Sequence, residues 1–451
     1  MLSCFKAYDI RGRLGAELNE DIARRIGQAF AEVLGAKTVC VGRDCRASSE
    51  ALMAATVEGL LAAGAQVLDL GLCGTEEIYH ATTHFGADGG IEVTASHNPM
   101  DYNGMKMVQR GSAPLEPALM RQIHDLAEAG EFRAAAPGQI REAIGARAAY
   151  VKTLTRFVDP KALRPLHILV NCGNGAAGPT FDALAEALQK KGAPLRFTRI
   201  HHEPDGSFPN GIPNPLLPEN QPVTAKAVRA HGADMGIAFD GDFDRCFFFD
   251  EVGSFVPGEY VVALLAAAFL GKENGATIVH DPRVIWATQE AVRRGGGTAV
   301  LAPTGHAFLK ATMRQTGAAY GGEMSAHHYF RDFMACDSGM IPWLLVAELM
   351  GRANQPLSGL VGQMRQDFPS SGEINFRVAD VAQAMARVEA ALSPEAVAID
   401  RTDGLSLDFG NWRLNLRASN TEPLLRLNVE ARGDAAVVSA GVTRLRPLIQ
   451  G

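Results

Sequence analysis

The chain has 451 residues, of which 47% are hydrophobic and 21% are charged, so it can form roughly three or four globular domains. Its formal net charge of −7 excludes the basic footprint of a nucleic-acid-binding protein. We therefore expect no nucleic-acid partner, although a local group of Arg or Lys side chains could still bind a small anion.

The cysteines and the apolar runs indicate the compartment. Seven cysteines are scattered along the chain without a Cys-x-x-Cys pair, which is typical of a reduced, cytoplasmic protein. The first residues, MLSCFKAYDIRG, contain no long apolar run and so predict no signal peptide. The longest apolar run, Val261–Leu270, is too short to span a bilayer, and we expect no membrane partner.

Helix and strand patterns alternate along the first part of the chain. A polar start, helical spacing and a terminal glycine predict a helix over Asn19–Gly35, and the β-branched run KTVCVG after it predicts a strand. A second helix then begins near Ser48, and a strand follows near Gln66–Leu70. This alternation predicts an α/β fold with a mixed or parallel sheet.

A weak repeat divides the chain further. GADGGI at Gly86–Ile91 matches GADMGI at Gly232–Ile237 and, more loosely, GAAYGG at Gly317–Gly322. Each copy follows a helical pattern and precedes a polar loop. The position ten residues after the first glycine of each copy holds Ser96, Asp242 and His327. We expect three related α/β domains, each with a loop at the carboxyl end of its sheet, where such folds bind ligands.

The last segment has a different pattern, with one helical stretch, VAQAMARVEAAL, among alternating strands such as WRLNLR. It predicts a smaller α+β domain. Turn-rich stretches separate the segments. The predicted domains are residues 1–147, 148–253, 254–367 and 368–451.

The stretch DGDFDR, from Asp240 to Arg245, directly follows the apolar run MGIAF. Asp240, Asp242 and Asp244 can converge on one hard cation, and Mg²⁺ prefers such oxygen ligands. A divalent cation would also remove the repulsion between the carboxylates. Arg245 could bind phosphate or pair with a carboxylate.

A second loop, TASHNP, places Ser96 between a small residue and a turn. Ser, Asn and Pro are ordinary turn formers, so the loop alone does not assign chemistry. As a phosphoserine, however, Ser96 could occupy an open position of the predicted metal site. His97 and Lys106 could neutralise charge or move protons.

Two further loops carry binding chemistry. In GEMSAHH, Glu323 and Ser325 alternate along an extended stretch, a geometry suited to vicinal hydroxyls. In RASNTEP, Arg417 and the small polar residues after it form a compact loop suited to phosphate. The stretch GNGAAG, Gly173–Gly178, fits a dinucleotide fingerprint but lacks the acidic residue expected about 20 positions later. An oxidoreductase is therefore disfavoured.

The motifs AYDIRG, TASHNPMDYNGMK, DGDFDR, GEMSAHH and RASNTEP, in this order, resemble the α-D-phosphohexomutase family, and within it the bacterial phosphomannomutase branch. The resemblance spans essentially the whole chain. It implies three similar mixed α/β-sheet domains plus a C-terminal α+β domain around a central cleft.

The resemblance also implies roles for individual residues. Ser96 would carry the phosphoryl group, and Asp240, Asp242 and Asp244 would bind Mg²⁺ together with it. Glu323 and Ser325, with His327 nearby, would hold sugar hydroxyls. The loop of Arg417, Ser419, Asn420 and Thr421 would bind the phosphate that is not reacting. Other matching positions are Tyr8, Arg11, Lys106, Arg245 and His306, and Arg283 stands where many relatives have Lys.

The implied reaction interconverts mannose 6-phosphate and mannose 1-phosphate through a phosphoserine and a hexose 1,6-bisphosphate, within nucleotide-sugar precursor synthesis. The expected partners are small-molecule hexose phosphates, and the expected state is a monomer or weak homodimer. A mutase that prefers glucose or glucosamine phosphate remains an alternative, and a non-catalytic sugar-phosphate-binding protein is a more distant one. The catalytic set comprises Ser96, His97, Lys106, Arg245 and Arg11, without a ranking of the proton movers.

Overall fold

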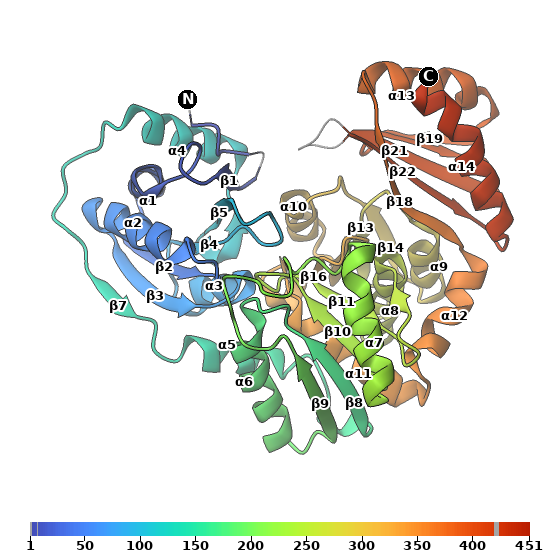
Figure 1. Cartoon of the computed structure of the whole chain (residues 1–451), viewed down its shortest axis with the longest axis horizontal. Coiled ribbons are helices and arrows are strands. Elements are labelled where there is room, and N and C mark those ends of the chain that lie inside the picture. Colours follow the sequence, from blue (N-terminus) through green and yellow to red (C-terminus); the bar gives the residue numbers. More distant parts are fainter. Residues whose placement is uncertain (1, 7, 419–423) are drawn as a thin grey trace. The chain divides into compact units, whose positions relative to one another are not determined.

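The computed structural model describes residues 2–6, 8–418 and 424–451 (Figure 1). The chain forms two compact units. The first contains residues 1–255 and 332–354, and the second contains residues 256–331 and 355–451. Within the described residues, no helix combines the length and the apolar character needed to cross a bilayer.

The first sheet of the first unit is mixed. Its strand order is β1-β5-β4-β2-β3-β7, with β6 paired to β5. Strand β2 runs parallel to β3 and β4, whereas β4 and β5 are antiparallel. The strands are β1 (Ile10–Arg13), β2 (Thr38–Arg43), β3 (Gln66–Leu72), β4 (Gly89–Val93), β5 (Tyr102–Gln109), β6 (Ala113–Pro114) and β7 (Ile140–Glu142).

Helices cover both faces of this sheet. Helix α1 (Glu20–Leu34) begins after Asn19, whose side chain accepts a hydrogen bond from the Ile22 N–H, and ends at Gly35 in the left-handed region, as predicted. With α2 (Ser49–Ala62) and α4 (Pro117–Ala129) it packs on one face around a common apolar core (Figure 1). Helix α3 (Thr75–His84) packs on the other face, against Cys40 of β2.

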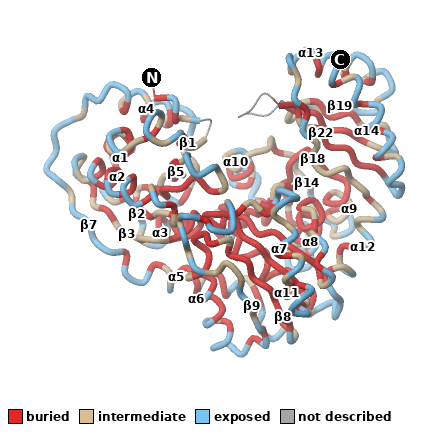
Figure 2. Tube along the Cα trace, viewed as in Figure 1, coloured by how far each residue is buried: buried red, intermediate tan, exposed pale blue. Residues whose placement is uncertain are grey.

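The second sheet of the first unit has the order β12-β11-β10-β8-β9. Its central strands are buried throughout (Figure 2). The strands are β8 (Leu166–Asn171), β9 (Leu195–Ile200), β10 (Met235–Phe239), β11 (Cys246–Phe249) and β12 (Phe255–Val256). The remaining elements of the unit are α5 (Ala146–Leu154), α6 (Ala177–Lys190), α7 (Gln221–His231), β17 (Cys336–Asp337) and α11 (Met340–Ala353).

The second unit also combines two kinds of sheet. One contains the run β14-β13-β15-β16 and is mixed, with helices α8, α9, α10 and α12. These elements are α8 (Gly258–Lys272), β13 (Thr277–His280), α9 (Trp286–Arg294), β14 (Thr298–Leu301), α10 (His306–Thr316), β15 (Tyr320–Gly322), β16 (His328–Phe330) and α12 (Leu357–Asp367).

The last sheet is antiparallel, with the order β18-β22-β21-β20-β19, and it packs its apolar face against α13 and α14. It is the smaller α+β domain that the sequence predicts. Its elements are β18 (Ser370–Arg377), α13 (Val381–Leu392), β19 (Ala398–Asp400), β20 (Leu405–Asp408), β21 (Trp412–Ala418), β22 (Leu424–Ala431) and α14 (Ala435–Gln450).

The weak sequence repeat has a structural basis. In each copy the first glycine, Gly86, Gly232 or Gly317, adopts a positive φ at the end of a helix. The strand that follows, β4, β10 or β15, is parallel to one neighbour and antiparallel to the next strand in the chain. The three mixed sheets are therefore built alike, and the same structural position is occupied by the loops of Ser96, Asp242 and His327.

Candidate active site

The loop after β4 holds Ser96 in a left-handed backbone conformation, with φ 49°. The Ser96 N–H donates to Thr94 Oγ1 at 2.9 Å. The buried Ser96 hydroxyl donates to Asp240 Oδ2 at 2.8 Å and lies 3.0 Å from His97 Nδ1. The TASHNP loop and the acidic loop, 144 residues apart in the chain, thus meet through their side chains.

The acidic loop connects β10 to β11 and is buried. Asp240, Asp242 and Asp244 each offer a carboxylate oxygen within 4.8 Å of the others. Asp242 Oδ1 is buried and has no hydrogen-bond partner within the described part of the chain. A buried carboxylate oxygen without a hydrogen-bond partner is unfavourable. Three carboxylates this close together are suited to binding a hard divalent cation. These acidic residues can hold a metal ion.

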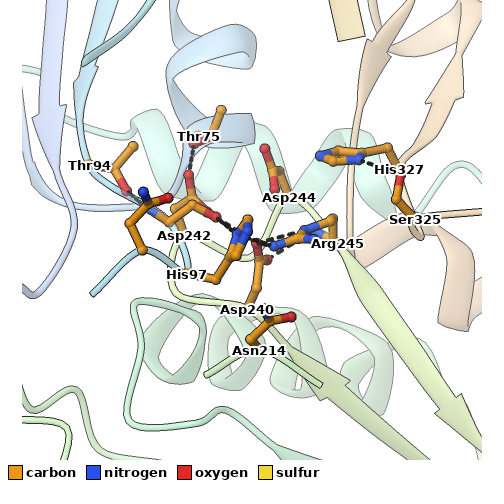
Figure 3. A network of polar contacts seen from close by, with 12 residues as sticks. Thr75, Thr94, His97, Asn214, Asp240, Asp242, Asp244, Arg245, Ser325 and His327 are labelled. Carbon is orange, nitrogen blue, oxygen red and sulfur yellow. Dashed lines mark hydrogen bonds and ion pairs between the residues drawn. The ribbon is translucent and has the colours of Figure 1, made fainter. Parts of the chain in front are cut away.

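Two cations lie against this cluster, the partly buried Lys106 and the buried Arg245, which Figure 3 labels. Lys106 Nζ, from β5, donates to Asp242 Oδ2 at 2.7 Å and also to Asp244. Arg245 Nε donates to Asp240 Oδ2 at 2.9 Å, and its Nη2 contacts His97 Nδ1. The carboxylates, the hydroxyl and the two cations therefore form one connected network.

The pKa directions show how the network distributes charge. Burial raises the pKa of Asp240, and burial together with the charge of Asp242 raises that of Asp244 well above its usual value. Burial also opposes ionisation of Asp242, but Lys106 outweighs it and lowers the Asp242 pKa. Burial and the neighbouring Arg245 lower the pKa of His97 well below its ordinary range, so His97 is neutral near pH 7.

Of the predicted residues Tyr8 and Arg11, Arg11 contacts the Ser96 loop. Arg11 Nη2 pairs with Asp9 at 2.7 Å, and its Nη1 donates to Asn98 Oδ1 in the Ser96 loop. Tyr8 is half-buried just before β1. Arg11 therefore lies beside the loop, and its guanidinium donates both to Asp9 and to Asn98.

The sequence did not single out Thr75, which begins α3. Its hydroxyl donates to Asp242 Oδ2 at 2.7 Å, and its N–H donates to the Asp242 carbonyl at 3.3 Å (Figure 3). Strand β3, which precedes it, is parallel to β2, as β4 is. The carboxyl ends of parallel strands lie at the same edge of a sheet. Thr75 could therefore have been predicted to lie near Ser96, because each residue follows a strand that is parallel to β2.

The second unit brings together the predicted residues of the GEMSAHH loop. Glu323 is buried and accepts from the Gly305 N–H at 2.9 Å and the Tyr329 hydroxyl at 2.6 Å. Burial raises the Glu323 pKa. Ser325 Oγ lies 3.2 Å from Arg283 Nη2 and 3.4 Å from His327 Nδ1.

Arg283 of the second unit is held by acidic neighbours. It is buried and pairs with Asp281 at 2.6 Å, and a second pair reaches Glu323 at 3.7 Å. His306 is the first residue of α10, after Gly305. Both residues therefore lie next to Glu323 in the fold of this unit.

Arg417, near the end of β21, is buried and pairs with Glu373 of β18 at 3.2 Å. The other predicted members of its loop, Ser419, Asn420 and Thr421, lie outside the described residues. Their place in a phosphate-binding loop stays a prediction.

Four family models match the chain in order. They are phosphoglucomutase/phosphomannomutase alpha/beta/alpha domain I at residues 3–134, domain II at residues 148–253, domain III at residues 257–368 and the C-terminal domain at residues 373–446.

Curated and solved proteins agree with these matches over the full length. A phosphomannomutase of Salmonella montevideo is 59% identical to this chain over 99% of each sequence. A Xanthomonas campestris protein named phosphohexose mutases is 54% identical over 100% of each. A solved phosphoglucomutase/phosphomannomutase family protein of Burkholderia thailandensis is 33% identical, with a TM-score of 0.88 over 99% of this chain and 97% of that chain.

The contact between Thr75 and Asp242 can be tested by Thr75→Val, which keeps the shape of the side chain but removes the hydroxyl. The change leaves a buried carboxylate with one donor fewer, so the free energy of unfolding should fall by about 1–3 kcal/mol. Urea denaturation measures the change. Thr75→Ser, which keeps the hydroxyl, is the matched control and should lose less stability. Wild-type stability in Thr75→Val would contradict a stabilising hydrogen bond to Asp242.

Proposed function

Because this chain belongs to the phosphoglucomutase/phosphomannomutase family, we propose that it is an isomerase that interconverts mannose 6-phosphate and mannose 1-phosphate. The observation that carries the proposal is the 2.8 Å hydrogen bond from Ser96 Oγ to Asp240 inside the buried acidic cluster. A hydroxyl in this position can carry a phosphoryl group beside carboxylates that bind a cation. Names of relatives such as the Salmonella phosphomannomutase favour mannose phosphate as the substrate.

In the proposed reaction, phosphorylated Ser96 gives its phosphoryl group to the free hydroxyl of a hexose monophosphate. The phosphorus–oxygen bond to Ser96 breaks as the bond to the sugar oxygen forms, and the sugar hydroxyl loses its proton. The product is a hexose 1,6-bisphosphate. The bisphosphate then reorients, so that its other phosphate faces Ser96. That phosphoryl group returns to Ser96, and the second hexose monophosphate is released.

Charge neutralisation is the main task of the surrounding residues, because phosphoryl transfer depends on positioning and electrostatics. Lys106 and Arg245 bring positive charge to the acidic loop. His97 is the nearest imidazole, with its Nδ1 3.0 Å from Ser96 Oγ. Lys106, Arg11 and His97 are the candidate proton movers.

We propose that Asp240, Asp242 and Asp244, together with an oxygen of phosphorylated Ser96, hold Mg²⁺. Three carboxylates and two cations leave the loop with a formal charge of −1. A phosphoryl group adds about −1.5 to −2, which a divalent cation offsets. When bound, Mg²⁺ would polarise the phosphoryl group and stabilise the charge that develops on its oxygens.

The proposed substrate-binding residues of the second unit act on the sugar and on the second phosphate. Glu323 would accept hydrogen bonds from sugar hydroxyls, and Ser325 would donate to them or accept from them, with His327 beside these two residues. Arg417 would bind phosphate with Ser419, Asn420 and Thr421. The remaining proposed binding residues are Tyr8, Arg283 and His306.

Glucose phosphate is a second candidate substrate. The Xanthomonas relative carries the broader name phosphohexose mutases, and the solved Burkholderia protein is named for both phosphoglucomutase and phosphomannomutase. Rates with mannose 1-phosphate, glucose 1-phosphate and glucosamine 1-phosphate, compared under identical conditions, rank the three substrates.

The broader setting is also a proposal. The seven cysteines are free thiols, which favours a reducing cytoplasm. The expected ligands are small hexose phosphates, and the expected state is a monomer or weak homodimer. The four domains are proposed at residues 1–147, 148–253, 254–367 and 368–451.

Ser96→Ala tests the assignment of the phosphoryl carrier. The variant lacks the oxygen that would form the phosphoserine, so turnover of mannose 1-phosphate should fall by at least about 1,000-fold while the protein stays folded. A coupled assay measures the rate, and circular dichroism checks the fold. Ser439→Ala, on the exposed face of α14, serves as the control and should keep full activity. Near-normal turnover by Ser96→Ala would remove Ser96 from the reaction.

Metal removal tests the role of the acidic loop. Dialysis against a chelator should lower the rate of hexose phosphate conversion by about 100-fold or more, and added Mg²⁺ should restore it. Products are followed by phosphorus NMR, because coupling enzymes can themselves need Mg²⁺. Full activity in metal-free buffer, with the absence of metal checked by elemental analysis, would contradict the proposed cofactor.

A further inference from the structure

Arg46 lies just after β2 and is almost completely buried, at 2% exposure. Its guanidinium donates to backbone carbonyls of the loop that carries the proposed phosphoserine and of Tyr102, where β5 begins. Nη2 donates to the carbonyls of Ser96 at 2.9 Å and Asn98 at 2.5 Å. Nη1 donates to the carbonyls of Pro99 at 3.0 Å and Tyr102 at 3.3 Å. One side chain therefore joins four peptide groups between Ser96 and the start of β5.

Asp44 connects Thr94, at the start of the loop, to the same arginine. Its carboxylate accepts from the Arg46 N–H at 2.9 Å and from Thr94 Oγ1 at 2.8 Å, and it faces Arg46 Nε at 3.6 Å. Thr94 Oγ1 in turn accepts from the Ser96 N–H at 2.9 Å. Both the N–H and the carbonyl of Ser96 are thus fixed, directly or through Thr94, by the Asp44–Arg46 pair.

Ser96 needs such support because its backbone is strained. With φ 49°, Ser96 lies in the left-handed region, which non-glycine residues rarely adopt and which is unfavourable for them. The Ser96 carbonyl also faces Gly241 of the acidic loop so closely that a Cβ on Gly241 would stand 2.4 Å from the Ser96 oxygen. The carbonyl is therefore confined between Gly241 and the Arg46 guanidinium.

The segment from Pro204 to Asn220, which connects β9 to α7, packs on this arginine through Phe208. The Phe208 ring lies 5.5 Å from Arg46 Cζ. A Cβ on Gly206 would stand 2.2 Å from the Cys45 carbonyl, so only glycine allows the segment to pack this closely. The guanidinium is shielded from water, which strengthens its hydrogen bonds to the loop.

We propose that Arg46 is a positioning residue for phosphoryl transfer. It holds Ser96 in the left-handed conformation that aims Oγ at the acidic loop, and it acts only through the backbone. This inference rests on the proposed function, because its predicted loss of rate is measured as mutase activity. A misplacement of about 1 Å at a reacting atom can cost about 100-fold in rate.

The side chain has to be arginine for this task. Its planar fork spreads donors over two terminal nitrogens, and here those donors reach four separate carbonyls. A lysine presents three donors from a single nitrogen and cannot span the same set. Arg46→Lys therefore preserves the buried charge but loses the clamp.

The experiment compares Arg46→Lys with Arg43→Lys. Arg43 is a nearby arginine whose side chain pairs with the exposed Glu50 at 3.3 Å, so its replacement should leave activity unchanged. For Arg46→Lys, kcat with mannose 1-phosphate should fall by about 100-fold, while KM changes by less than about threefold. Hydrogen exchange followed by mass spectrometry should show faster exchange over residues 94–104 and wild-type exchange elsewhere.

Thr94→Val provides a second variant if Arg46→Lys does not fold. It keeps the side-chain shape but removes the hydroxyl between Asp44 and the Ser96 N–H, so it should show the same split between kcat and KM. A kcat within about threefold of the wild type in a folded Arg46→Lys variant, with unchanged exchange over residues 94–104, would overturn the proposal. So would a loss of activity that matches the unfolded fraction alone.

The exchange measurement separates this inference from the proposed function. If the wild type and Arg43→Lys both lack mutase activity, the proposed function fails. Selective loosening of residues 94–104 in Arg46→Lys would still support the clamp, and unchanged exchange would reject it.

Discussion

Three buried carboxylates within 4.8 Å of one another are the constraint on which the rest of the site depends. Burial opposes ionisation of these carboxylates, and their like charges add to that opposition, so the pKa values of Asp240 and Asp244 are raised. Lys106 and Arg245 offset part of the charge. A site with this charge balance is suited to a divalent cation and a phosphoryl group, which neutralise each other.

The fold satisfies the constraint by bringing the ends of strands together. Strand β4 leads to Ser96, β10 leads to the acidic loop, and β3 leads to Thr75. Side chains that contact Asp242 come from α3 and β5, more than 130 residues away in the chain. Two sheets of one compact unit thus supply a carboxylate cluster, its cations and the hydroxyl beside it.

Much of this could be predicted from the sequence, because short-range signals carry it. Asn19 and Gly35 mark the ends of α1, and the repeated glycines mark the helix ends before three equivalent strands. Counting from those glycines led to Ser96 and Asp242. Thr75 and the guanidinium clamp of Arg46 were not predicted, because they depend on hydrogen bonds between distant segments. The pairing of Arg283 with Asp281 is local, but only the fold shows that Glu323 shares it.

The most direct test of the central claim is to locate the phosphoryl group. Purified protein is incubated with a hexose 1,6-bisphosphate whose phosphoryl groups carry an isotopic label, then digested and mapped by mass spectrometry. A second sample is first chased with excess unlabelled mannose 1-phosphate. The account predicts one labelled phosphoryl group on Ser96, which passes to the sugar phosphates during the chase while unlabelled phosphate from the bisphosphate replaces it. Label on another residue, or label on Ser96 that the chase does not remove, would contradict it.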